Sequence, residues 1–292
     1  MEKLLGYLRL TRPANVITAV ADVLAGMVIS GYFLVQVDLW PVFLICLSTI
    51  GLYSGGIIFN DVFDAELDRV ERPERPIPSG LIPLRAAIIF GSVCFAGGIF
   101  AAGLYQPVSI LLAIAIVIAC LTYNKWLKHH FILGPLNMGI CRGLNLLLGM
   151  SILTTGLADW WFLALIPVVY IFAITMISRG EVHGGSKKTM VFAALLYLVV
   201  ISCLLYVAVA QHYFLLILVF IVPFGLMIYR PLLAAFRNPE GRNIGKAVKA
   251  GVIALILLNA TWSAAFGNWQ VALCIVLLLP LSMGLSKLFA VT

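Results

Sequence analysis

The sequence predicts an all-α membrane protein, a polytopic bundle of nine to ten transmembrane spans that forms one domain over residues 1–292. Hydrophobic residues make up 63% of the chain and charged residues only 11%, whereas a soluble domain usually carries about 25% charged residues. Apolar runs of span length follow one another along the whole chain. The basic residues fall on one side of the resulting map, as expected for a multi-pass membrane protein.

The apolar runs define ten candidate spans, each close to the roughly 20 residues that a membrane helix needs. They cover residues 14–35, 39–60, 85–104, 107–124, 132–153, 159–178, 189–210, 213–230, 245–265 and 269–287. The first run follows Arg12 and Pro13 and has span length, which indicates a retained helix rather than a cleaved signal. The last two runs are divided by Gly267 and Asn268 and are the weakest part of the map, so nine spans is the alternative.

The charges orient this map. All basic residues except Arg142 lie on one side, and the loops of the other side contain Asp38, Asp159 and His212. Because cytoplasmic loops are enriched in Lys and Arg, we place the basic side and both termini in the cytoplasm, in an inner or plasma membrane. The net charge of +7 then reflects topology, anionic ligands and lipid headgroups, which argues against nucleic acid as a partner.

Four oxygen-bearing side chains mark the cytoplasmic end of the second span, which reads Asn60-Asp61-x-x-Asp64-x-x-x-Asp68. On one continuous helix the three aspartates would lie within about 60° of one another, with Asn60 about 40° further round. Carboxylates crowded on one face repel each other, and a divalent cation removes that repulsion. Mg²⁺ takes oxygen ligands and usually binds through one or two carboxylates, substrate phosphates and water. We therefore predict these four residues as ligands of Mg²⁺.

A stiff basic loop follows the aspartates, with the pairs Arg72-Pro73 and Arg75-Pro76. A residue before proline is restricted to extended conformations, and guanidinium groups match phosphate oxygens bidentately. Carboxylates for a metal beside two restricted arginines suit a diphosphate. The alternative interpretation is a solvated, salt-bridged loop at the end of a span.

The stretch from Asn60 to Gly80 resembles the first aspartate-rich motif of the UbiA superfamily of intramembrane prenyltransferases, N-D-x-x-D-x-x-x-D followed by R-P-x-R-P-x-x-x-G. It is particularly similar to the archaeal branch that prenylates geranylgeranylglyceryl phosphate, while Cys-Arg-Gly-Leu-Asn at 141–145 resembles the EboC-like branch. The motif match covers roughly residues 9–190. The resemblance implies a helical bundle, usually of nine spans, around a lipid-accessible central cavity, and transfer of an isoprenoid from its diphosphate.

Two further segments resemble family motifs. Tyr123 and Lys128 match a Y-x-x-x-L-K segment, which implies that Lys128 binds phosphate and that Tyr123 faces the cavity. An interfacial aromatic residue beside a snorkelling lysine is the alternative. Arg12 and Asn15 belong to an R-P-x-N segment, in which Asn15 either lines the cavity or caps the first span.

The fifth span carries three polar residues, Asn137, Arg142 and Asn145. Arg142 is the only basic residue deep in an apolar run, and Asp22 in the first span is the only deep carboxylate. Because intramembrane charges are costly and normally face a partner or a cavity, we predict either an Asp22–Arg142 pair or contact between Arg142 and the substrate phosphate. We expect Asn137 and Asn145 to line the cavity.

The loop after the sixth span departs from the family pattern. The resemblance places roughly D-x-x-D-x-E-G-D followed by K-T-L here. This chain has at the four acidic positions Ser178, Glu181, His183 and Gly185. Either one Mg²⁺ suffices, with Arg179, Lys187 and Lys188 supplying positive charge, or ionisation of a diphosphate is impaired. His183 could ligate a metal as neutral imidazole.

The function predicted from these features is Mg²⁺-dependent transfer of a prenyl group from an isoprenoid diphosphate to a lipid or aromatic acceptor in the membrane. We assign catalysis to Asp64, Asp68 and Glu181, with Glu181 or Asp64 as general base. The diphosphate-binding residues are the six cations already named, Arg72, Arg75, Lys128, Arg142, Arg179 and Lys188. The alternative is a non-catalytic isoprenoid-lipid binding or transport protein, which the eroded second motif favours. Polar chemistry at the membrane edge rather than at the midplane favours the enzyme.

Overall fold

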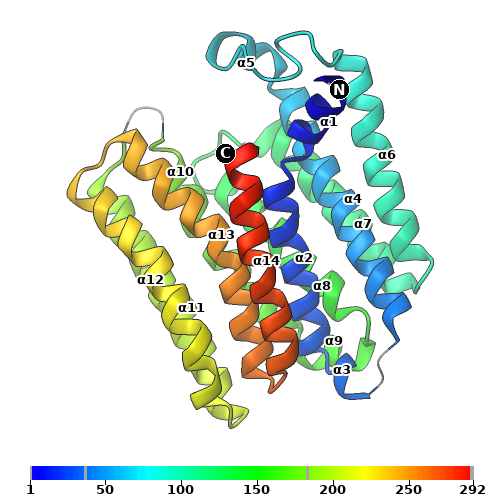
Figure 1. Ribbon diagram of the computed structural model, residues 1–292, viewed down its shortest axis with the longest axis vertical. Helices are drawn as coiled ribbons and strands as arrows, with labels where there is room; N and C mark the ends of the chain where they lie inside the picture. The colour runs from blue at the N-terminus through cyan, green and yellow to red at the C-terminus, as the bar shows by residue number, and fades with distance from the viewer. Residues whose placement is uncertain (1, 36–37, 182–183, 290–292) are drawn as a thin grey trace.

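Figure 1 shows the computed structural model of the protein, which describes residues 2–35, 38–181 and 184–289. All regular elements within these ranges are helices. The first half contains α1 (Glu2–Thr11), α2 (Pro13–Ile29), α3 (Tyr32–Val35), α4 (Leu39–Phe63), α5 (Ala65–Glu71), α6 (Leu84–Gly103) and α7 (Pro107–Thr122). A π-helical turn (Tyr123–Leu127) then leads to α8 (Leu133–Met150) and α9 (Thr154–Trp160). A 3₁₀ turn (Trp161–Ala164) precedes α10 (Leu165–Ser178), α11 (Lys187–Ala210), α12 (Phe214–Arg237), α13 (Gly241–Ala265) and α14 (Trp269–Leu288).

The membrane-bundle prediction is confirmed, because each of the ten predicted spans corresponds to a helical stretch. Within the described part of the chain, eight helices are long and apolar enough to cross a membrane, and nine if the bent pair α1–α2 counts as one span. The fifth predicted span, α8, is not among them, because Asn137, Arg142 and Asn145 lower its mean hydropathy. Its polarity is explained by its position inside the bundle.

Helix α2 lies at the centre of the bundle and packs against α4, α8, α13 and α14 (Figure 1). Close approach of α2 to α8 depends on two glycines. A side chain at Gly26 would collide with the backbone of α8, and one at Gly149 would collide with the backbone around Val23. Small residues at such crossings let membrane helices approach closely. This contact brings Asp22 on α2 next to Arg142 on α8.

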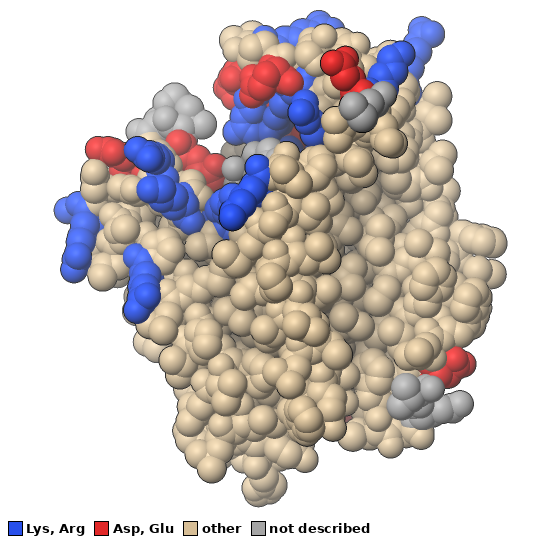
Figure 2. Space-filling model, viewed as in Figure 1, with Lys and Arg blue, Asp and Glu red and all other residues tan. Residues whose placement is uncertain are grey.

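The charged residues gather at one end of the molecule, over α1, α5, the ends of α12 and α13, and the neighbouring loops (Figure 2). Figure 2 shows the remaining visible surface as almost entirely uncharged, apart from an acidic residue at the opposite end. Large apolar side chains are exposed along the outer helices, as on α11, where Leu195, Leu198 and Val199 are about half exposed. An apolar belt between a charged end and a short-looped end is the surface of an integral membrane protein.

Candidate active site at the basic end of the bundle

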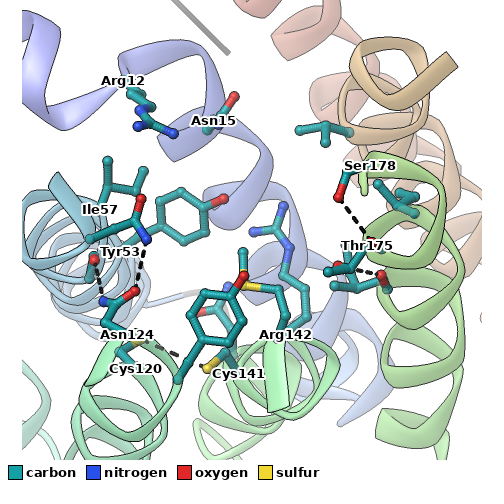
Figure 3. A pocket seen from close by; sticks show the side chains of 18 of the residues that line it. Arg12, Asn15, Tyr53, Ile57, Cys120, Asn124, Cys141, Arg142, Thr175 and Ser178 are labelled. Carbon is teal, nitrogen blue, oxygen red and sulfur yellow. Dashed lines mark hydrogen bonds between the residues drawn. The ribbon is translucent and has the colours of Figure 1, made fainter. Parts of the chain in front are cut away.

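A cavity of about 380 Å³ opens between α2, α4, α7, α8, α10 and α13 toward the charged end. Its mouth, as we call the part nearest that end, contains Arg12, Asn60, Arg72 and Glu181. Its floor is the polar group Tyr53, Arg142 and Asn145, and apolar residues of α10 and α13 form much of the wall between (Figure 3). Along α4 the lining runs from Leu52 to Asn60, which is a depth of about 12 Å at 1.5 Å per residue.

The aspartate motif spans a break in the helix rather than one continuous helix. Helix α4 ends at Phe63, α5 begins at Ala65, and Asp64 between them has φ −91° and ψ 0°. This conformation is typical of turn residues, and aspartate is a poor helix former. The assumption of a single helical face is therefore wrong for Asp64, which turns toward α7, while Asp61 and Asp68 face the arginine loop.

Each aspartate of the motif is paired with a basic residue. Asp61 Oδ1 lies 2.7 Å from Arg12 Nη2 and 3.3 Å from Arg75 Nη1. The same Arg75 nitrogen lies 2.7 Å from Asp68 Oδ2, and Asp64 pairs with Lys128. Three carboxylates thus face three cations, and the mouth is close to electrically neutral. Glu66 points away, is exposed, and pairs only with the exposed Arg69.

The donors predicted for Mg²⁺ are present, but among the described residues no three acidic, histidine or cysteine side chains are arranged to hold a metal. The reason is visible at Arg75, whose Nη1 lies between Asp61 and Asp68 and contacts both. A positive charge therefore already lies where a cation shared by these carboxylates would bind. The hard oxygen donors fit Mg²⁺, provided that Arg75 moves to another partner.

Arg12 is a site residue for which no role was predicted. It lies between α1 and α2, which meet at a bend of 42°, and its φ of 45° is left-handed. A left-handed conformation is uncommon outside glycine and costs free energy unless other contacts hold it. The contact with Asp61 is such a contact. The R-P-x-N segment could have indicated this residue, because it places a basic side chain directly before the first span.

The segment after α7 forms a π-helical turn over Tyr123–Leu127, an irregularity that is frequent at functional sites. It directs Tyr123 and Asn124 into the cavity and brings Lys128 to Asp64. Asn124 accepts a hydrogen bond from Asn60 Nδ2 at 3.0 Å and donates to the carbonyl of Gly56 at 3.1 Å. Asn60 is thereby held at the mouth, as predicted, although its side-chain amide donates its hydrogen bond to Asn124.

Among the described residues of the segment that corresponds to the second motif, Glu181 is the charged side chain that lines the cavity. Glu181 lines the mouth, and its Oε1 has no hydrogen-bond partner in the described ranges. Burial raises the pKa of Glu181 above its usual range, and the charge of Arg72 partly counteracts this rise. His183 lies outside the described residues. Ser178 and Gly185, which replace two expected aspartates, offer no carboxylate.

Arg179 and Lys188 are not directed into the cavity. Arg179 Nη2 donates to the carbonyl of His130 at 2.5 Å, and its guanidinium lies 5.4 Å from the Phe131 ring. Lys188 is exposed in the first turn of α11. Their assignment to the diphosphate stays a prediction that requires movement of both side chains.

A buried polar network lies beneath the cavity, in the middle of the bundle. Arg142 Nη1 lies 3.1 Å from Asp22 Oδ2, so the predicted pair is confirmed. Asp22 accepts hydrogen bonds from Asn145 at 3.1 Å and from Asn259 at 2.7 Å. Thr49 donates to the Asn145 side chain at 2.6 Å. Asn259 on α13 was missed because no charge or motif distinguishes it in the sequence.

Asn15 and Asn145 line the cavity as predicted, whereas Asn137 does not appear in its wall. Asn137 Oδ1 instead accepts from the thiol of Cys141 at 3.7 Å. Cys120 and Cys141 both line the cavity, with their sulfur atoms 3.9 Å apart. Neither of these two thiols was predicted to face the site.

The fold and the site together define an integral membrane protein with a cavity whose mouth carries paired acidic and basic side chains. Residues 19–244 match the model of the UbiA prenyltransferase family. The chain belongs to this family, and the prediction made from the aspartate motif is confirmed.

Individual relatives of similar sequence or structure are consistent with membership of this family. The digeranylgeranylglyceryl phosphate synthase of Sulfurisphaera tokodaii is 33% identical over 178 residues, which cover 61% of this chain and 62% of that relative. The match thus spans less than two thirds of that relative's length. A solved structure described as a digeranylgeranylglyceryl phosphate synthase in membranes has a TM-score of 0.68 at 22% identity, and covers 92% of this chain and 100% of that one.

A UbiA homologue from Archaeoglobus fulgidus, solved with GPP and Mg²⁺ bound, has a TM-score of 0.63 at 15% identity. This likeness covers 86% of the present chain and 99% of the homologue. At these identities the two solved structures show a shared fold.

Proposed function

We propose that this protein transfers a prenyl group from an isoprenoid diphosphate to an acceptor inside the membrane, in a Mg²⁺-dependent reaction at the cavity mouth. The observation that carries the proposal is the continuity of the cavity, which joins charged groups at its mouth to an apolar interior. Such a cavity suits a substrate with a charged head and an apolar tail. GPP, which is bound together with Mg²⁺ in the Archaeoglobus homologue, belongs to this chemical class.

The cations of the mouth bind the diphosphate in this proposal. Arg12 and Arg75 leave Asp61, Lys128 leaves Asp64, and these groups together with Arg72 donate to the phosphate oxygens. Mg²⁺ bound to the freed carboxylates would neutralise negative charge on the departing diphosphate. Preorganised cations around a leaving group are an efficient way to stabilise a transition state.

The rest of the cavity protects the allylic carbon after the bond to the diphosphate breaks. Its apolar wall excludes water, and the rings of Tyr53 and Tyr123 offer π-faces to a carbocation. Glu181 is the candidate general base for the acceptor, because it lies at the mouth with a carboxylate oxygen that accepts no hydrogen bond from any described residue. The one-sided distribution of basic residues supports a mouth that faces the cytoplasm.

Replacement of Asp64 by alanine tests the proposal. Purified protein in nanodiscs is incubated with labelled geranylgeranyl diphosphate and Mg²⁺, and release of diphosphate is measured. Asp64→Ala should abolish Mg²⁺-dependent release. Glu66→Ala is the matched control, because Glu66 belongs to the same segment but is exposed and faces away. Equal rates in wild type and Asp64→Ala would contradict the proposal.

A binding or transport protein is the second candidate, and the loss of acidic residues after α10 favours it. The same incubation separates the two functions. Tight Mg²⁺-dependent binding of the labelled diphosphate without release would support the binding protein. Release with transfer of the label to a co-purified lipid would support the enzyme and identify the acceptor by mass spectrometry.

A further inference from the structure

Arg142 is the one cation at the floor of the cavity, among the residues that the structure describes. It lies on α8 between Cys141 and Gly143, and its side chain is only 5% exposed. Figure 3 shows its guanidinium in the space between Tyr53 and the helix that carries Thr175. The group is therefore buried from bulk water but faces the space in which a substrate would bind.

The orientation of Arg142 is fixed by several contacts. Its Nη2 donates to the hydroxyl of Thr18, its Nη1 lies 3.1 Å from Asp22, and its Cζ lies 5.1 Å from the centre of the Tyr53 ring. Nη1 nevertheless makes no hydrogen bond within the described part of the chain. Asp22 directs its carboxylate oxygens to Asn145 and Asn259. A guanidinium has five N–H groups, so the contacts with Thr18 and Asp22 leave further N–H groups of Arg142 without a partner among the described residues, in a rigid position at the cavity wall.

A purely structural pair is a poor explanation for this arrangement. Buried ion pairs are often no more stabilising than apolar residues of similar volume. Ionisable groups at membrane depth are costly, and they mark substrate or ion sites far more often than packing sites. Arg142 lines the cavity, and a guanidinium with N–H groups beyond those used by Thr18 and Asp22 can donate a hydrogen bond to a ligand there.

That ligand is not the diphosphate of the proposed reaction. Arg142 lies nine residues into α8 from Leu133, which is about 13 Å from its basic end. On α4, Tyr53 lies eight residues before Asp61, or about 12 Å below the aspartates. The mouth has its own cations for the diphosphate. Arg142 is therefore placed for the second substrate, the acceptor.

The charge of the pair indicates what kind of acceptor group binds. Asp22 balances Arg142, so the floor is close to neutral before any ligand enters. A dianionic phosphate at this depth would lose its hydration without a free positive charge to compensate. An uncharged carbonyl or hydroxyl oxygen needs only the N–H donor.

We propose, on the basis of the function inferred above, that Arg142 is the specificity-determining residue for the acceptor and binds an uncharged oxygen of it at the cavity floor. The acceptor then lies with its polar oxygen on Arg142 and its nucleophile toward the mouth. This distinguishes the present chain from relatives whose names specify a phosphate-bearing product.

The test compares two lipids that differ only in the phosphate, geranylgeranylglycerol and geranylgeranylglyceryl phosphate. Equilibrium binding of each is measured in nanodiscs with Mg²⁺ and inorganic diphosphate present, so that the mouth is filled. We expect wild type to bind the neutral lipid at least about tenfold more tightly than the phosphate. Arg142→Gln should weaken binding of the neutral lipid by about tenfold or more, and Arg142→Lys by less.

Asp22→Asn provides the converse test, since it removes the balancing charge and should increase affinity for the phosphate lipid. Arg85→Gln, at an exposed arginine, is the control that changes neither affinity. Thermal unfolding and binding of Mg²⁺ with inorganic diphosphate are measured for every variant to establish that the fold and the mouth are intact.

Tighter binding of the phosphate lipid by wild type, or unchanged binding of the neutral lipid by Arg142→Gln, would overturn the proposal. Failure of wild type to bind Mg²⁺ with diphosphate would instead count against the proposed function. The two failures are therefore distinguishable in one set of samples.

Discussion

Replacing Arg75 by glutamine tests whether the cations of the mouth keep Mg²⁺ out until a diphosphate arrives. Arg75 Nη1 contacts both Asp61 and Asp68, at 3.3 and 2.7 Å, and all three side chains are at most 15% exposed. With Arg12 and Lys128 also paired, a divalent ion that enters alone meets a neutral site and adjacent positive charges. The diphosphate gives those cations another partner, so the two ligands should bind cooperatively.

The size of the effect follows from these contacts. Each arginine–carboxylate contact at about 3 to 4 Å is worth on the order of 4 kcal/mol in Coulomb energy at an effective dielectric constant of about 20, before desolvation is subtracted. The net coupling between two bound ligands is usually about 1–3 kcal/mol, or roughly 5- to 150-fold in affinity. We expect Arg75→Gln to strengthen binding of the metal alone by an amount in this range, and to weaken binding of Mg²⁺ with diphosphate.

Binding of Mn²⁺ in place of Mg²⁺ can be followed by electron paramagnetic resonance, with and without inorganic diphosphate. Arg69→Gln is the matched control, because Arg69 is 61% exposed and pairs only with Glu66, and it should behave as wild type. The reasoning is refuted if wild type binds the metal alone as tightly as with diphosphate. It is equally refuted if Arg75→Gln leaves metal binding unchanged.

Three further predictions concern other parts of the cavity and the bundle. Burial raises the pKa of Glu181, so if this group is the base, turnover should fall as pH drops through that raised value, and Glu181→Gln should remove this acid limb from the pH–rate profile. Cys120 and Cys141 face the cavity, so maleimide labelling measured by mass spectrometry should slow when Mg²⁺ and geranylgeranyl diphosphate are bound; unchanged labelling would contradict the cavity assignment. A β-carbon at Gly139 would lie 2.5 Å from a carbonyl oxygen of α10, so Gly139→Ala should destabilise the protein by about 1–3 kcal/mol in thermal unfolding. Gly97→Ala, where nothing lies within 4 Å, should cause no loss.

The fold could be predicted almost completely from the sequence, because the hydrophobic length of a span and the side of the basic loops are properties of local composition. Helix α8 was predicted as well, although its composition differs from that of the other spans. Its three polar residues reduce its hydropathy below that of the other spans, and they are tolerated because α8 is enclosed by α2, α4, α7 and α10. A polar helix that still spans the bundle is a sequence signal for a cavity.

The site was predictable in its residue types but not in its partners. Spacing placed Asp61 and Asp68 on one side and identified Arg75 as a neighbour. The contact of Arg12 with Asp61 joins residues 49 positions apart, and the one between Asn259 and Asp22 joins residues 237 positions apart. Periodicity within one helix carries no information about such contacts, which depend on how helices pack.

The charge balance of the mouth bears on the acidic residues that are missing from the second motif. Four carboxylates lie at or beside the mouth, those of Asp61, Asp64, Asp68 and Glu181, and four cations face them, those of Arg12, Arg72, Arg75 and Lys128. Three more carboxylates after α10 would leave uncompensated negative charge at the mouth and would require a second metal to neutralise it. Without them the mouth is neutral by itself, so one Mg²⁺ offsets most of the negative charge that a diphosphate brings. Loss of the second motif is therefore compatible with diphosphate binding, provided that one divalent ion and the arginines together neutralise the diphosphate.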